Sequence, residues 1–156
     1  MTKQGDHLHV TYRFETHTDH VVYVNDGAVQ QISNTRWVKN TRNNHVEPLD
    51  ARTVVITVGT PGDVPAVVGV PGFYVPVAKG AAFEGARDVA LPFAGTDALT
   101  RAAKRGDWFT KASFRLYASD GEPARWRELP TDAGPVRVPD GPPLRFLTGA
   151  VQPLPQ

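Results

Sequence analysis

The sequence predicts a mostly β protein: an antiparallel β-sandwich or a distorted barrel of about eight to ten short strands, with one short helix at about residues 96–105. Fourteen glycines and fourteen prolines divide the 156 residues into short apolar runs. These runs are rich in Val, Thr, Tyr, Phe and Trp, which favour strands. One segment alone has a helix signature with both ends marked.

The first strand is predicted at the N-terminus, where apolar residues at positions 8, 10, 12 and 14 alternate with polar ones. This period of two is typical of a half-buried strand. A polar turn at residues 17–20 and a return run at residues 21–24 predict a hairpin that ends at Asn25-Asp26-Gly27. A third, less regular strand is expected over residues 28–38.

The valine-rich residues 52–60 predict the clearest strand of the chain. Pro-Gly pairs at residues 61–62 and 71–72 predict turns, because Pro presets φ and Gly accepts a positive φ. The segment around them is expected to form a meander of short strands. Pro65 and Pro76 would restrict their strands to an edge or a bulge.

The predicted helix has signals at both ends. Thr96 is a suitable N-cap, Asp97 lies in the first turn, Lys104 and Arg105 lie in the last turn, and Gly106 is placed to end the helix. Its apolar stripe consists of Leu99, Ala102 and Ala103. A stripe this narrow predicts that the helix covers one side or one end of a sheet.

A second hairpin is predicted from residues 108–118 and 123–129, joined at Asp120-Gly121, since Asp-Gly between β runs favours a type I′ turn. This register would place Arg115 opposite Trp126. Residues 136–138 and 144–147 predict two further short strands.

Chain length and composition predict one mostly β domain at residues 1–149 and a Pro-rich, polyproline-prone tail at residues 150–156. The absence of cysteine excludes disulfides, thiolate metal sites and a Cys nucleophile, and is compatible with a reducing compartment. A polar N-terminus and the absence of a long apolar run predict a cytoplasmic protein with no membrane partner. The Arg-, Ala-, Val- and Pro-rich composition is typical of a high-GC bacterial or phage genome.

Histidines near the N-terminus suggest a metal site. His7 and His9 share one face of the first strand, and His17 and His20 flank the predicted turn. The two pairs lie about 25–30 Å apart along an extended strand, so they cannot form one centre. Solvent-exposed histidines are the favoured interpretation, and a small metal-dependent enzyme that uses these four residues is the weaker alternative.

Common catalytic motifs are absent from the sequence. None of its three serines lies in a Gly-x-Ser-x-Gly motif, and neither a Walker A loop nor a Gly-x-Gly-x-x-Gly sequence occurs. The sequence therefore favours a protein that is not an enzyme and that needs no cofactor.

Cations and aromatic rings occur together in two regions, which suggests single-stranded nucleic acid as a ligand. Binders of this class stack bases on aromatic rings in a basic groove. The candidate residues are Trp37, Lys111, Arg115, Trp126 and Arg127. The net charge of the whole chain is only +1, so this function remains an alternative.

The favoured function is a non-enzymatic binding or self-assembly module that acts through its surface, on a protein partner or a second copy of the chain. Its candidate contacts are Phe73 and Tyr74, which follow the second Pro-Gly turn. Adjacent side chains of an extended segment point in opposite directions, so one of the two rings is a candidate for exposure, and the alternative, at least as well supported, is that both rings pack under neighbouring loops. Exposed aromatic residues are common anchors of protein interfaces.

Overall fold

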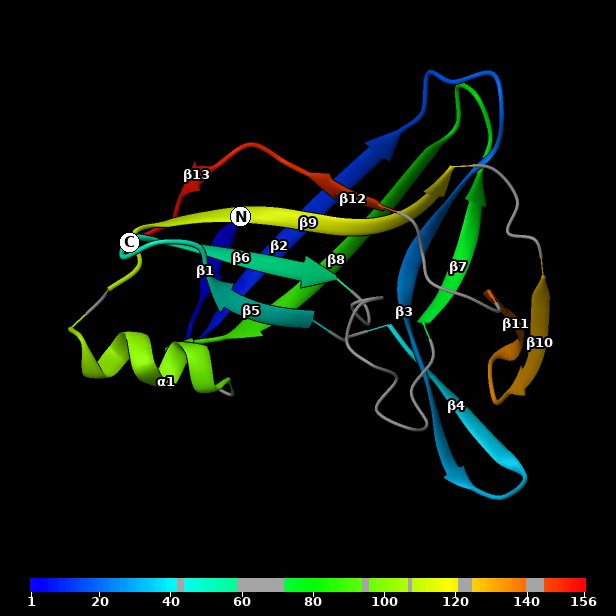
Figure 1. The fold of residues 1–156 in the computed structure, drawn as a ribbon, viewed down its shortest axis with the longest axis horizontal. Coiled ribbons are helices and arrows are strands. Elements are labelled where there is room, and N and C mark those ends of the chain that lie inside the picture. The colour runs from blue at the N-terminus through cyan, green and yellow to red at the C-terminus, as the bar shows by residue number, and fades with distance from the viewer. Residues whose placement is uncertain (42–43, 59–71, 94–95, 107, 121–124, 140–144) are drawn as a thin grey trace.

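The structure, a computed structural model, describes residues 1–41, 44–58, 72–93, 96–106, 108–120, 125–139 and 145–156. These residues form thirteen strands and one short helix, and the strands do not close into a barrel. The predicted fold class is confirmed, and the architecture resembles a β-sandwich (Figure 1). No described helix is long and apolar enough to cross a membrane.

The strands are β1 (Thr2–Gln4), β2 (His7–Glu15), β3 (Val22–Ser33), β4 (Arg36–Asn40), β5 (Asn44–Pro48), β6 (Thr53–Val58), β7 (Gly72–Val77), β8 (Ala82–Ala90), β9 (Lys111–Asp120), β10 (Trp126–Thr131), β11 (Gly134–Pro139), β12 (Arg145–Thr148) and β13 (Gln152–Pro153), and the helix is α1 (Asp97–Lys104).

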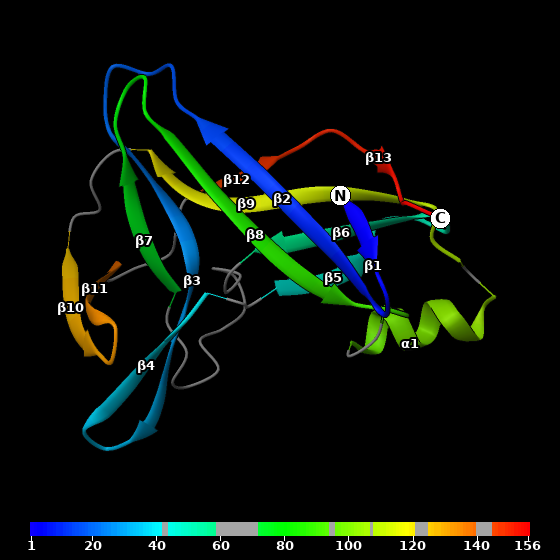
Figure 2. The ribbon, with the colours of Figure 1, turned by 180° about the vertical axis from the view of Figure 1, so that it is seen from behind.

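Two sheets form the two layers. The smaller sheet has the order β1-β2-β8, and the larger has the order β11-β10-β4-β3-β9-β6-β5, with β7 added to β3 and with β12 and β13 added to β9. Figure 2 shows β2 and β8 crossing in front of the larger sheet, with α1 and both termini at one end of the molecule and the β3–β4 hairpin at the other. Most pairs are antiparallel, but β6–β9 and β10–β4 are parallel.

The main core lies between the two sheets. On β2 the alternation is as predicted, since Leu8 and Val10 are buried while Thr11 is exposed. Leu8 and Val10 pack against Val54 and Ile56 of β6 and against Leu99 of α1. A second, smaller core joins β3 and β7 to the β10–β11 hairpin. The hydrophobic pattern therefore gives the correct inward face of β2 and places α1 over one end of the sandwich.

Both predicted hairpins are wrong. β2 pairs with β1 and β8 rather than with β3, and β3 continues through Asn25-Asp26-Gly27 instead of turning there. β9 does not pair with β10, and Arg115 lies opposite Thr57 and Thr148 rather than Trp126. In both cases the strand was correctly located, but its neighbour comes from a distant part of the chain.

Other elements are close to their predicted places. Residues 53–58 form β6, which is buried along its whole length, and α1 begins after Thr96, whose hydroxyl accepts a hydrogen bond of 3.1 Å from the N–H of Leu99. Pro76 lies in β7, which among the described strands pairs only with β3. Some predicted features lie outside the described residues, namely the Pro-Gly turn at residues 61–62, Pro65, Pro71 and Gly121.

The C-terminal segment lies on the larger sheet. Gln152 and Pro153 pair with the start of β9, and Leu154 packs against the main core. Its backbone N–H donates a hydrogen bond of 2.8 Å to the carbonyl oxygen of Thr110. Residues 150–156 therefore contribute to the sandwich in spite of their high proline content.

Candidate functional site

An apolar pocket is formed beside α1 by residues from both ends of the chain. Figure 1 shows α1 at one end of the molecule. Its volume is about 340 Å³, at the lower end of the range of small-molecule sites. The described lining residues are Lys3 of β1, Leu8 of β2, residues 91–93 after β8, Leu99 and Ala103 of α1, residues 108–109 before β9, and residues 154–155 after β13. The pocket thus depends on segments from the whole length of the chain.

The sequence of α1 explains why a hollow remains beside it. Leu99 is buried and anchors the helix on the core. Ala103 lies one turn later on the same side of the helix and also lines the pocket. Because alanine has only a β-carbon, the space next to the second turn stays unfilled. Across the pocket, Phe93 and Phe109 meet edge to face with ring centroids 6.3 Å apart.

The rim of the pocket combines an exposed aromatic ring with positive charge. Trp108 lines the pocket and is 68% exposed. The guanidinium of Arg52 lies 5.3 Å from the centroid of its ring, a cation–π arrangement. The nearby carboxylate of Asp50 accepts hydrogen bonds from the backbone N–H groups of Arg52 and Thr53, which lower its pKa.

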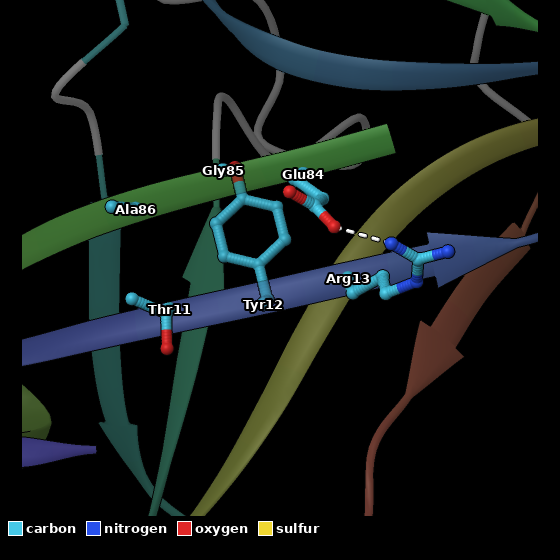
Figure 3. A pocket seen from close by; sticks show the side chains of 6 residues that line it. All are labelled: Thr11, Tyr12, Arg13, Glu84, Gly85 and Ala86. Carbon is cyan, nitrogen blue, oxygen red and sulfur yellow. Dashed lines mark hydrogen bonds and ion pairs between the residues drawn. The ribbon is translucent and has the colours of Figure 1, made fainter. Parts of the chain in front are cut away.

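A second hollow, of about 610 Å³, lies between β2 and β8 (Figure 3). The ring of Tyr12 extends over Gly85, where a β-carbon would collide with it. Beside it, Arg13 forms ion pairs with Glu84 and Glu15. Arg13 and Glu84, the two charged residues that line the hollow, therefore compensate each other, while Glu15 adds a second carboxylate that leaves this cluster of charges net negative.

A buried ion pair between Arg87 and Asp26 links the two sheets inside the sandwich. Arg87 of β8 is only 4% exposed, donates hydrogen bonds of 2.8 Å to the carbonyl oxygens of Asp26 and Ala86, and lies 3.4 Å from the carboxylate of Asp26. Its guanidinium also lies 5.7 Å from the ring centroid of Tyr12. Burial raises the pKa of Tyr12 to about 12, so its hydroxyl stays protonated at neutral pH. These contacts hold the two layers together, and Tyr12 and Ala86 connect them to the hollow between β2 and β8.

The predicted histidines have these surroundings in the structure. Nδ1 of His7 lies 2.6 Å from Asp6, and Nδ1 of His9 lies 2.7 Å from Asp88 on β8. His17 and His20 are exposed between β2 and β3. In the part of the chain that the structure describes, no group of three or more His, Asp or Glu side chains is arranged to hold a metal ion.

The predicted nucleic-acid residues are spread over three strands. Trp37 of β4 is half-buried beside the second core, and Trp126 of β10 packs on Tyr23 with ring centroids 4.9 Å apart. Arg115 lies 3.2 Å from Glu47. Lys111 and Arg127 are exposed on β9 and β10, which are not neighbours in the sheet. The described structure does not arrange these residues along a single basic groove.

Phe73 and Tyr74 point to opposite sides of β7, as expected, but both are buried. Phe73 is 1% exposed and packs with Val29 and Leu129, and Tyr74 is 5% exposed and packs with Tyr117. Of the two alternatives that the sequence leaves open, the structure shows the one in which both rings are packed, because this part of the larger sheet is covered on both faces. The exposed aromatic ring is that of Trp108 instead.

Sequence reasoning placed Trp108 at the start of a strand and did not single out Lys3 or Leu154. One local signal was present: Trp108 closely follows Gly106, where the helix was predicted to end, so a connecting loop was the natural place for it. Lys3 and Leu154 carry no such signal, since 151 positions separate them and only the fold brings them to one pocket.

No protein-family model matches this chain, and neither the curated proteins nor the solved structures include a significant match.

Proposed function

We propose that the protein is a non-enzymatic binding module whose binding site is the apolar pocket beside α1. The observation that carries this proposal is an exposed indole, Trp108, at the mouth of an apolar hollow of about 340 Å³. Small-molecule sites are mostly apolar concave pockets, and the volume and lining of this hollow fit that description. An apolar group that enters it would bury both the pocket wall and part of the indole.

The residues around the pocket favour binding over catalysis. Among the described lining residues, Lys3 is the only titratable one. General acid–base catalysis and nucleophilic catalysis both need positioned polar groups, usually in pairs. The wall offers apolar surface from Leu8, Phe93 and Leu99, which supports retention of an apolar ligand or side chain.

A neutral fluorophore of matching size tests the proposal. We expect 1-naphthylamine, with about eleven non-hydrogen atoms at about 30 Å³ each, to bind at one saturable site with a blue-shifted emission. Ala103→Phe should fill the pocket and weaken binding by about tenfold or more.

The matched control is Thr100→Phe, which adds the same ring at an exposed position of α1 that does not line the pocket. It should leave the affinity unchanged. Circular dichroism would establish that both variants are folded. Equal affinity of folded Ala103→Phe and wild type would refute the proposed site, as would titration without saturation.

A further inference from the structure

The chemistry of the pocket points to one class of ligand. Resting on the function proposed above, we infer that the pocket takes an amphipathic carboxylate, with an apolar body of about eight to ten carbon atoms inside the pocket and the carboxylate at its positive rim. The inference combines the size of the hollow, its apolar wall and the position of two cations.

The volume sets the size of the apolar body. A group of the size of a methylene or a water molecule occupies about 30 Å³ in a liquid. A hollow of about 340 Å³ therefore holds roughly eleven such groups. Octanoate and decanoate match this size, whereas the chain of a longer fatty acid would extend into solvent.

Lys3 supplies the first positive charge. It pairs with Leu8 across β1 and β2, so both side chains lie on the same face of the small sheet, the face that packs on the core. Lys3 is nevertheless exposed, which means that its stem follows the apolar wall while its ammonium group reaches solvent at the rim. Among the described residues it has no carboxylate partner, in contrast to Lys79, which pairs with Asp19.

Arg52 supplies the second positive charge. Its guanidinium lies over the Trp108 ring, and this ring forms part of the pocket wall. No carboxylate side chain occurs among the described lining residues. The nearby carboxylate of Asp50 is held by two backbone N–H groups, one of them that of Arg52, and among the described contacts it forms no ion pair with the Arg52 guanidinium. The rim therefore favours an anionic head group over a neutral or cationic one.

Displacement of bound 1-naphthylamine by three ligands with the same alkyl chain tests the inference. At low ionic strength we expect octanoate to bind at least about fivefold more tightly than 1-octanol, because a partly exposed ion pair contributes a modest free energy. Octyltrimethylammonium should bind more weakly than both, because the cations at the rim repel its positive head group. Across hexanoate, octanoate, decanoate and dodecanoate, the affinity should rise and then level off near decanoate.

The variant Lys3→Gln tests the contribution of the Lys3 ammonium group to binding of the carboxylate. It should weaken octanoate binding by about fivefold and leave 1-octanol binding unchanged, while Lys79→Gln should change neither. Equal affinity of octanoate and 1-octanol for the wild type, or an equal loss of both in Lys3→Gln, would overturn the inference about the head group and leave the proposed pocket intact. Failure of 1-naphthylamine and of every alkyl ligand to bind would overturn both.

Discussion

At the scale of single residues, the buried ion pair between Arg87 and Asp26 links the two sheets and bears on stability. A buried charge is costly unless a partner and hydrogen bonds compensate it. Arg87 meets this need with two backbone carbonyl oxygens and one carboxylate. Burial raises the pKa of Asp26 above its ordinary value, while the charge and the hydrogen bond of Arg87 oppose this shift.

Replacement of Arg87 by Met should make stability depend more strongly on pH. An acid whose pKa is raised on folding binds more protons in the folded state, so its contribution to stability falls as pH rises from its unfolded pKa, near 4, through its folded pKa. Without Arg87 the pKa of Asp26 rises further. We expect Arg87→Met to lose about 3 kcal/mol at pH 8 and less at pH 5, as measured by urea denaturation.

The double variant Asp26→Asn/Arg87→Met separates charge from packing. It removes the carboxylate that Arg87→Met leaves without a cation, so it should recover part of the loss at pH 8. A loss that is the same at both pH values, and that Asp26→Asn does not reduce, would show that Arg87 acts through its backbone hydrogen bonds and its packing on Tyr12 rather than through the ion pair.

At the scale of elements, β3 shows how a turn motif becomes a bulge. Its register shifts between Asn25 and Gly27, and the side-chain oxygen of Asn25 accepts a hydrogen bond of 3.0 Å from the N–H of Gly27. Gly27 has φ of +149°, in the region that favours glycine. The bulge lets one strand pair with β9 near its start and with β4 near its end, and so extends the sheet into the β3–β4 hairpin.

Gly27→Ala should therefore be severely destabilising. A β-carbon at this position would collide with the carbonyl oxygen of Asn40 in β4, and the backbone conformation adds strain. We expect a loss of about 3 kcal/mol or more in urea denaturation. Gly80→Ala is the matched control, because Gly80 has φ of +75° with open space around its α-carbon. It should lose only about 1 kcal/mol, and equal losses would contradict the role given to Asn40.

At the scale of the whole molecule, the C-terminal segment completes both the sheet and the pocket. Ala118 pairs with Val24 of β3 on one side and with Arg145 of β12 on the other, so β12 covers an edge of β9 that would otherwise be open. β13 extends this cover to the start of β9. Leu154 then reaches the core and the pocket wall.

Truncation after Gly149 should test this arrangement. The shortened chain loses β13 and the side chain of Leu154, and we expect its free energy of unfolding to fall by about 2 kcal/mol. Binding of 1-naphthylamine should weaken at the same time, because part of the pocket wall is gone. Removal of the exposed Gln156 alone is the control. A truncated chain with unchanged stability and unchanged affinity would mean that residues 150–156 form a dispensable tail.

Much of the secondary structure could be predicted from the sequence. Three local patterns each predicted an element close to its observed place: the alternation along residues 8–14, the β-branched run that forms β6 and the capping signals around α1. These features depend on the preferences of neighbouring residues and on which face of a strand is apolar. Both properties depend only on a short stretch of sequence, so the fold class and most strand positions could be predicted without knowledge of any distant contact.

The pairing of the strands and the candidate site were decided by the tertiary structure. A period of two says which face of β2 is buried but not which strand lies beside it, and β8 carries Gly85 and Arg87 at inward positions, where a strand pattern calls for apolar residues. Gly85 is explained by the ring of Tyr12, with which a β-carbon would collide, and Arg87 is explained by its ion pair with Asp26. In the same way, Lys3, Trp108 and Leu154 become a site only when the two ends of the chain meet at α1. Contacts between residues far apart in sequence depend on which surfaces pack together, and local propensity carries no information about that choice.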